Sequence, residues 1–335
     1  MEIPKTKEFA RRVFSITNES AFRQIALEVY HFQYYNNPVY RLFCDTIDRT
    51  PAQVVALQQV PFLPISFFKT HEIRCFDAAP EAIFRSSGTT GMEQSRHLVK
   101  DLELYRESFT RCFERFYGKV QNYCVLGLLP SYLERVDSSL VYMVQQLIRS
   151  SGHPDSGFYL YDHQQLASVL RRLENKGQKT LLIGVTFALL DFARAFPMKL
   201  SHTTIMETGG MKGRGKELVR EEVHQMLANA FQTGIIHSEY GMTEMLSQAY
   251  ANGAGRYSTP PWLKVFVRDE TDPLSCIDAQ QKTISGALNV VDLANLYSCS
   301  FIATEDLARL YSDGSFEILG RMDNTDVRGC SLMTV

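Results

Sequence analysis

The sequence predicts an α/β protein whose parallel-rich sheets are covered by helices, with a small β subdomain at the C-terminal end. Between Asp101 and Gly241, short apolar runs of strand length alternate with segments of helical periodicity, and this alternation is typical of parallel sheets. From about Lys264 onward the helical pattern gives way to successive strand-like runs. The length of 335 residues favours about two domains. We therefore expect an N-terminal helical segment and an α/β core over residues 1–262, and the small β subdomain with a hinge and a short C-terminal tail over residues 263–335.

Each expected element depends on a local pattern. Apolar residues recur at helical spacing from Phe22 to Tyr30, before the turn signal of Asn36–Pro38. Apolar residues also recur at steps of three and four from Asp101 to Phe116, which predicts a helix there. The other predicted strands are residues 122–130, 157–161, 179–185, 202–208, 234–241, 264–269, 283–293, 301–311 and 315–321, and the other predicted helices are residues 138–151, 163–175, 186–196 and 216–231.

Composition excludes several classes of protein. The net charge of −2 leaves no basic footprint for nucleic acid. The seven cysteines form no C-x-x-C pair, which argues against a zinc site, and their odd number argues against a complete disulfide framework. The N-terminus has no signal-like apolar stretch, and no apolar run is long enough to span a membrane. We expect a cytoplasmic protein with reduced thiols.

A loop rich in small hydroxyl residues follows Arg85 in the stretch RSSGTTG. Its glycines permit positive φ and a close backbone approach, and its hydroxyls can donate to phosphate oxygens. The loop lacks the lysine of a Walker A motif. A flexible Ser/Gly surface turn is the alternative. The phosphate-binding candidates are Ser86, Ser87, Gly88, Thr89, Thr90 and Gly91.

A second polar loop, SEYGMTE, follows a predicted strand. Tyr240 offers a ring on which a base could stack, Thr243 offers a hydroxyl for a phosphate, and Glu244 offers an oxygen ligand for Mg²⁺. The alternative is a strand end followed by a helix cap. His237 precedes this loop, where it either orients a substrate carboxylate or is an ordinary strand-end histidine. We interpret His202 and His224 as surface residues.

Two further candidates lie in the C-terminal part. Asp306 follows an apolar strand in ATEDLARL, where a carboxylate could accept both hydroxyls of a ribose. Arg321, in LGRMDNTDVRG, offers a planar donor for sugar or phosphate oxygens. A surface carboxylate and an ordinary turn rich in Asp and Asn are the alternatives.

The order and combination of SSGTTG, YGMTE, TED and GR-x-D-x4-RG resembles the adenylate-forming enzymes, over Arg85 to Gly329. The resemblance implies the large-domain fold of that superfamily with ATP and Mg²⁺ as cofactors. It also implies that the Ser/Thr/Gly loop handles the ATP phosphates and that the glycine pair of METGG flanks the adenine. The remaining implied roles are adenine stacking by Tyr240 beside Gly241, phosphate and metal binding by Thr243 and Glu244, ribose binding by Asp306 and Arg321, and adenine flanking by Gly209 and Gly210.

Two departures from that superfamily stand out. The phosphate loop continues as GMEQSRHLV without the usual Pro-Lys pair, so Arg96 or His97 would have to supply a positive charge. The typical member also continues past the hinge aspartate, here Asp323, into a mobile lid that carries a lysine. Since the sequence ends at Val335, we expect this lid to be absent or vestigial. Candidates to replace its lysine are Lys69, Lys100 and Lys212.

The segments YHFQYYNNPVYRLFC, VPFLPISFFKTHEI and RGCSL resemble the acyl-protein synthetases, the fatty acid–protein ligases of bacterial bioluminescence. This resemblance implies that a fatty acid is activated as acyl-AMP and then carried on Cys330, for delivery to an acyl reductase or a carrier protein. The neighbouring Arg328 could favour the thiolate of Cys330; a small apolar residue in a terminal strand is the alternative. The other cysteines suit the core.

Three questions remain open at this point. The acyl acceptor could instead be coenzyme A or a carrier protein, as in aryl- and acyl-CoA ligases. The chain could also be an inactive nucleotide-binding scaffold subunit. Finally, VPFLPISFF could line a tunnel for an acyl chain or could simply pack in the core.

Overall fold

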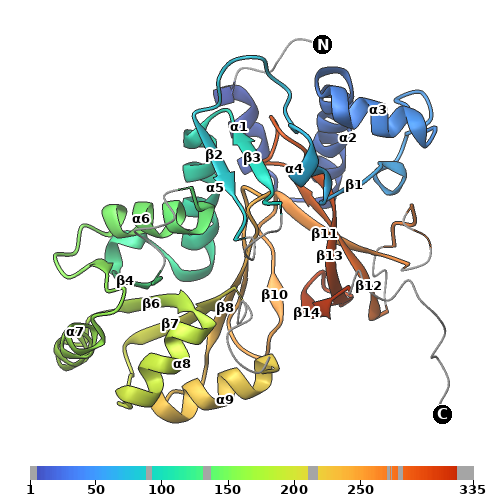
Figure 1. Ribbon diagram of the computed structural model, residues 1–335. Helices are drawn as coiled ribbons and strands as arrows, with labels where there is room; N and C mark the ends of the chain where they lie inside the picture. The colour runs from blue at the N-terminus through green and yellow to red at the C-terminus, as the bar shows by residue number, and fades with distance from the viewer. Residues whose placement is uncertain are drawn as a thin grey trace, which may run out of the picture.

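The main feature of the computed structural model is a mixed sheet flanked by helices (Figure 1). The structure describes residues 6–87, 93–130, 137–209, 218–269, 272, 274–277 and 282–322. Across these residues twelve strands form one sheet, in the order β11-β12-β13-β14-β10-β9-β8-β7-β6-β4-β5, and β1 pairs with β13 beside this path. The predicted α/β class is therefore confirmed.

One half of the sheet is parallel. Strands β4 (Cys124–Leu128), β6 (Thr180–Val185), β7 (Thr203–Thr208) and β8 (His237–Tyr240) pair in parallel, and β5 (Gly157–Phe158) pairs with β4 at the edge. Every residue of β4 and β6 is buried. Burial on both faces explains why these strands appear in the sequence as continuous apolar runs.

Helices cover both faces of this parallel half (Figure 1). Helices α5 (Leu102–Tyr117) and α6 (Ser139–Ser151) lie on one face. Helices α7 (His163–Asn175), α8 (Thr186–Ala195) and α9 (Arg220–Phe231) lie on the other, where their rings meet in the contacts of Phe192 with His163 and Phe231. This arrangement exposes the carboxyl ends of the parallel strands at one edge, where ligands of such sheets bind.

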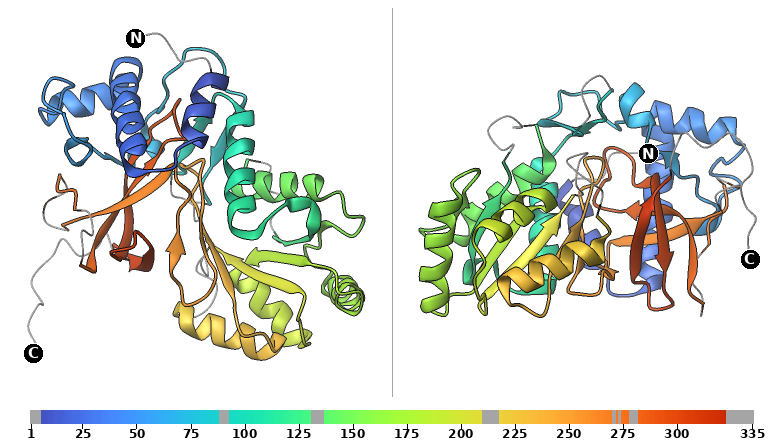
Figure 2. Two further views of the ribbon diagram at one scale, coloured as in Figure 1. Left: turned by 180° about the vertical axis from the view of Figure 1, so that it is seen from behind. Right: turned by 60° about the horizontal axis from the view of Figure 1, so that its bottom comes forward.

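The other half of the sheet is antiparallel. Its centre is the long strand β13, beside which the N-terminal helices lie (Figure 2). Tyr30 of α2 meets Phe301 of β13 edge to face, and Gln33 donates from Nε2 to the Leu296 carbonyl at 2.8 Å. The bounds are β9 (Ala249–Ala251), β10 (Tyr257–Ser258), β11 (Leu263–Arg268), β12 (Ile284–Asp292), β13 (Phe301–Leu310), β14 (Phe316–Arg321), α1 (Thr6–Phe14), α2 (Glu19–Asn36) and α3 (Pro38–Thr46).

The segment that follows the N-terminal helices lies against β13. Strand β1 (Leu63–Pro64) pairs in parallel with β13, and the short helix α4 (Phe67–Thr70) follows it. Strands β2 (Ala82–Arg85) and β3 (Arg96–Val99) form a separate two-stranded sheet, and the candidate phosphate loop joins them in the sequence. Two 3-10 turns complete the described elements, at Leu57–Gln59 and Val120–Asn122.

The core includes most of the residues that the sequence assigned to it. Five cysteines are buried as expected, whereas Cys276 is partly exposed. Phe62, in the stretch considered for an acyl tunnel, packs against Phe266 and Phe301, which favours the core-packing alternative there. Within the described ranges, no helix combines the length and apolar character needed to cross a membrane.

Candidate functional site

Tyr240, Asp306 and Arg321 form a cluster at the junction of the two halves of the sheet. Tyr240 ends β8, and Asp306 and Arg321 are cross-strand partners on β13 and β14. The Tyr240 hydroxyl donates to Asp306 Oδ2 at 2.7 Å, and Arg321 Nε lies 3.5 Å from Asp306 Oδ1. The fold thus brings together three residues that the sequence predicted to bind one nucleoside.

In this cluster the neutral phenol of Tyr240 faces the carboxyl group of Asp306. Burial, followed by the nearby Asp306 charge, raises the pKa of Tyr240, so its hydroxyl remains a donor. Burial also raises the pKa of Asp306, while Tyr240 and Arg321 oppose that rise. A carboxylate has about four lone-pair sites. Asp306 can therefore accept further hydrogen bonds from a sugar diol while it keeps Tyr240.

The Tyr240 ring is supported on one side by two aromatic residues. Phe316 meets it edge to face at a centroid distance of 5.5 Å, and Tyr257 lies tilted at 5.8 Å. Tyr257 and Phe316 in turn stack on each other. Tyr240 is partly exposed as a residue, and a flat ligand could stack on its supported ring.

Glu244 lies in the turn that follows β8 and is only 4% exposed. Burial raises the pKa of its carboxyl, whereas the Ser95 side chain and the charges of Arg321 and Lys69 act in the opposite direction. Within the described residues, no group of three or more His, Cys, Asp or Glu side chains could hold a metal alone. A single carboxylate nevertheless fits Mg²⁺, which proteins often bind through one or two carboxylates together with phosphates and water.

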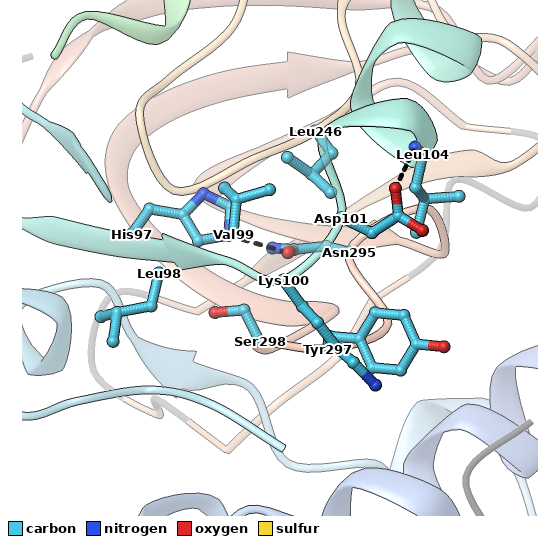
Figure 3. A pocket seen from close by; sticks show the side chains of 10 residues that line it. All are labelled: His97, Leu98, Val99, Lys100, Asp101, Leu104, Leu246, Asn295, Tyr297 and Ser298. Atoms are coloured by element: carbon cyan, nitrogen blue, oxygen red, sulfur yellow. Dashed lines mark hydrogen bonds between the residues drawn. The ribbon is translucent and has the colours of Figure 1, made fainter. Parts of the chain in front are cut away.

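His97 and Asn295 hold the turn that carries Glu244, and Figure 3 shows the contact between these two side chains. His97 Nδ1 donates to the Thr243 carbonyl at 2.8 Å, and its Nε2 lies 3.0 Å from Asn295 Oδ1. The Asn295 amide donates to the Glu244 and Cys299 carbonyls, both at 2.8 Å. The carbonyls of Thr243 and Glu244 are thereby held by His97 of β3 and by Asn295 in the turn after β12.

The sequence offers Arg96 or His97 as a source of positive charge, and of these two residues His97 does not suit that role. Burial lowers the pKa of its ring to about 4, although its contacts with Thr243 and Asn295 oppose this shift. A ring of this pKa is neutral at neutral pH. It carries one N–H and therefore satisfies one of the two oxygens that it faces.

The base of the phosphate loop lies next to Glu244. The Ser86 backbone N–H donates to the Ser95 carbonyl at 3.1 Å, and the Ser95 N–H donates to Ser86 Oγ at 2.9 Å. Ser95, which acts on Glu244, is therefore tied to the first residue of the loop. Ser87 is also described. Gly88, Thr89, Thr90 and Gly91 lie outside the described residues.

The glycine candidates near the parallel strands are partly described. Gly209 directly follows β7 with a φ of 60°, and its carbonyl accepts a hydrogen bond from Thr186 Oγ1 at 3.1 Å. A Cβ atom at Gly241 would lie 2.5 Å from Glu239 Oε1, so a side chain there would require that carboxyl to move. Gly210, together with Lys212, Asp323, Arg328 and Cys330, lies outside the described residues.

His237 and His224 take positions that the sequence did not specify. His237 begins β8, at the other end of the strand from Tyr240, and its Nδ1 lies 3.2 Å from the Tyr117 hydroxyl. Burial lowers its pKa. The structure therefore does not bring His237 into the cluster. The interpretation of His224 as a surface residue is wrong, because its side chain is 16% exposed and Nε2 lies 3.6 Å from Glu207 Oε1.

The fold is similar to that of solved adenylate-forming enzymes. ATP-bound MatB from Rhodopseudomonas palustris matches with a TM-score of 0.54 and 17% identity, over 73% of this chain and 49% of that chain. The O-succinylbenzoate coenzyme A synthetase MenE from Bacillus subtilis, in complex with ATP and magnesium, matches with a TM-score of 0.52 and 15% identity. This match covers 76% of this chain and 53% of that chain. The chain thus spans about half the length of these solved structures.

A narrower family also matches. The model of the family described as "Acyl-protein synthetase, LuxE" covers residues 14–334. A curated relative, the long-chain-fatty-acid–luciferin-component ligase of Vibrio harveyi, is 23% identical over 334 aligned positions, which cover 90% of this chain and 84% of that protein. The chain belongs to the acyl-protein synthetase family, as the sequence predicted, and is a ligase of that family.

Proposed function

We propose that this protein activates a fatty acid with ATP as an acyl-adenylate and then passes the acyl group to a protein thiol. The observation that carries the proposal is the meeting of Tyr240, Asp306 and Arg321 beside the buried carboxyl of Glu244. Tyr240 offers an aromatic surface for the base, and Asp306 offers an acceptor for the ribose hydroxyls. Glu244 lies where we expect the phosphates of the same nucleotide. The family of the chain supplies the fatty acid as substrate class.

In the first step a carboxylate oxygen attacks the α-phosphorus of ATP. The new O–P bond forms as the bond to the β-phosphate oxygen breaks, and pyrophosphate leaves with the electron pair. Tyr240, Asp306 and Arg321 hold the adenosine, and the hydroxyls of Ser86 and Ser87 would donate to the phosphates. Glu244 would hold Mg²⁺, which when bound neutralises phosphate charge. Positioning and charge neutralisation are the main contributions of the protein.

In the second step the thiolate of Cys330 attacks the acyl carbonyl. A thioester forms, the bond between the acyl carbon and the phosphate oxygen breaks, and AMP leaves with the electron pair. The thiolate is the reactive form because it is the stronger nucleophile. The acyl group then passes to a partner, either an acyl reductase or a carrier protein.

The first step is tested by exchange of radioactive pyrophosphate into ATP. We expect exchange only when a fatty acid is present, and a panel of chain lengths defines the preferred acid. Glu244→Gln should lower the exchange by at least about 100-fold, as loss of one charge-stabilising group does in other enzymes. Glu222→Gln, on the exposed face of α9, is the matched control. Exchange without added acid, or exchange that survives Glu244→Gln, would contradict the proposal.

The second step is tested by labelling with a radioactive fatty acid. Cys330→Ser should retain pyrophosphate exchange and lose the hydroxylamine-sensitive label on the protein. Cys276→Ser, which removes the partly exposed cysteine of the described residues, should keep both activities. A label that persists in Cys330→Ser would exclude Cys330 as the acyl carrier, and a label on free coenzyme A would identify a different acceptor.

A further inference from the structure

Arg268, at the end of β11, is a buried cation that no described acid neutralises. The residue is 8% exposed. Among the residues that the structure describes, it pairs with no carboxylate, and burial lowers the pKa of its guanidinium. A buried charge is costly unless hydrogen bonds compensate for its lost hydration. An arginine at this position therefore depends on the hydrogen bonds that its guanidinium donates.

The guanidinium of Arg268 connects three strands and the residue that follows a fourth. Nη1 donates to the Leu288 carbonyl of β12 at 2.9 Å and to Asn289 Oδ1 at 2.7 Å. Nη2 donates to the Thr304 carbonyl of β13 at 2.6 Å and lies 3.8 Å from Met322 Sδ, directly after β14. The two ends of a planar guanidinium can reach acceptors on different strands, whereas a lysine has a single nitrogen for them.

Two of these acceptors lie where the pairing of β12 with β13 is irregular. On β12 the register shifts between Ala287 and Asn289, so that Leu288 alone faces residues 304–306 of β13. Backbone groups in such an irregularity lose the partners that a regular ladder supplies, and buried groups of this kind need others. Arg268 donates to one carbonyl on each side of the irregularity. It therefore stabilises a local backbone shape that the ladder itself does not.

The irregular part of β13 includes Asp306, the candidate ribose ligand. The Asp306 backbone N–H donates to Thr304 Oγ1 at 3.1 Å, and this hydroxyl donates to the Leu288 carbonyl at 2.9 Å. The same carbonyl accepts from Arg268, so one connected set of hydrogen bonds joins the guanidinium to the Asp306 backbone. Arg268 also contacts the residue that directly follows Arg321. It thus acts on the backbone beside both candidate ribose ligands.

We propose that Arg268 is a positioning residue for the ribose of ATP and that it acts through Thr304 on the Asp306 carboxyl. This inference depends on the proposed function, because it concerns the nucleotide of the same site. A carboxylate that accepts hydrogen bonds from two hydroxyls must be held within about 0.5 Å of its productive position. Arg268 fixes the part of β13 that carries this carboxyl, and it does not contact the nucleotide itself.

The test compares ATP with 2′,3′-dideoxy-ATP in fatty acid-dependent pyrophosphate exchange. Arg268→Lys keeps the positive charge and loses the fork of donors. It should lower kcat/KM for ATP by about 10-fold to 100-fold, mainly through KM, because the ribose contacts are displaced. The same variant should change kcat/KM for the dideoxy nucleotide little, since that nucleotide has no hydroxyls for Asp306. Arg309→Lys, at an exposed position of β13, is the matched control and should behave like the wild type.

Substitutions at Thr304 test the same connection without removing the buried cation, and they serve as the test if Arg268→Lys does not fold. Thr304→Val removes the hydroxyl that accepts the Asp306 N–H, so it should show the same selective loss with ATP. Thr304→Ser keeps a hydroxyl and should discriminate between the two nucleotides like the wild type. Equal losses with both nucleotides in Arg268→Lys or Thr304→Val would indicate a structural role alone and overturn the inference.

The wild-type protein separates this inference from the proposed function. Absence of acid-dependent exchange in the wild type would overturn the proposed function. Acid-dependent exchange that does not distinguish the two nucleotides would overturn ribose binding by Asp306, and the inference with it. Discrimination that is equally strong in the wild type, Arg268→Lys and Thr304→Val would overturn the positioning role and leave the proposed function standing.

Discussion

At the scale of single residues, Glu239 is the most unusual acid near the site. Its side chain is 7% exposed, and the Thr208 hydroxyl donates to its Oε2. Burial raises the pKa of Glu239 to about 7, and the charge of Glu207 on the neighbouring strand adds to this effect. The carboxyl is therefore about half protonated at neutral pH, directly before Tyr240 in the sequence and beside Gly241.

This raised pKa predicts how stability depends on pH. The folded state keeps the Glu239 proton up to a pH of about 7, whereas an unfolded chain releases it near 4.5. The unfolded state thus binds fewer protons in this window, so the free energy of unfolding falls as pH rises from about 4.5 to about 7. A shift of this size corresponds to roughly 3 kcal/mol.

Glu239→Gln should remove this part of the pH dependence. Its stability relative to the wild type should be higher at pH 8 than at pH 5, as measured by urea unfolding at both values. Burial raises the pKa of Asp292 to about 6, so this residue should maintain part of the dependence of the unfolding free energy on pH in the variant. An unchanged difference between the two pH values would show that Glu239 is ionised in the folded protein throughout this range.

At the scale of elements, the turn after β8 is held by residues from other strands. Asp292 at the end of β12 accepts hydrogen bonds from the Leu246 and Ser247 backbone N–H groups at 2.7 and 3.0 Å. His97 and Asn295 hold the preceding carbonyls. The backbone around Glu244 is therefore fixed by a network of contacts, in addition to the contact of its carboxyl with the Ser95 side chain.

Asn295→Ala tests this network. The substitution leaves the Glu244 and Cys299 carbonyls without their donor in a buried region, which should cost roughly 2 to 4 kcal/mol of unfolding free energy. The looser turn should also raise the Mg²⁺ concentration needed for half-maximal pyrophosphate exchange. Asn229→Ala, at an exposed position of α9, should change neither quantity. A destabilised variant with an unchanged Mg²⁺ requirement would contradict the positioning role.

Elements with their own sequence signal could be predicted, and elements that depend on neighbours could not. Strands β4 and β6 are continuous apolar runs, and α5 has clear helical periodicity. Strand β10 has two residues and is stabilised by the stacking of Tyr257 on Phe316, far along the chain. The sequence predicts α9 from about Lys216, whereas the helix begins at Arg220, after the extended residue Val219.

The same distinction applies to the site. Tyr240, Glu244, Asp306 and Arg321 lie in short motifs and could be identified from the sequence. The role of Asn295 could not, because its contacts with His97 and with the turn arise only when β3, β8 and β12 are assembled.

At the scale of the whole molecule, the candidate site lies where the two halves of the sheet meet. Tyr240 belongs to the last parallel strand, whereas Asp306 and Arg321 belong to the antiparallel half. A nucleotide bound there would contact both halves at once. The predicted boundary between residues 262 and 263 stays a prediction, since strands on either side of it share one sheet.

The most direct test is a crystal structure with a fatty acid and an ATP analogue whose α,β-bridge is methylene. The adenine should lie against the Tyr240 ring, the ribose hydroxyls within hydrogen-bonding distance of Asp306, and the phosphates between Ser86 and Glu244. Density for the nucleotide in any other part of the molecule, with Tyr240 still bonded to Asp306 and no ligand beside them, would contradict the central claim.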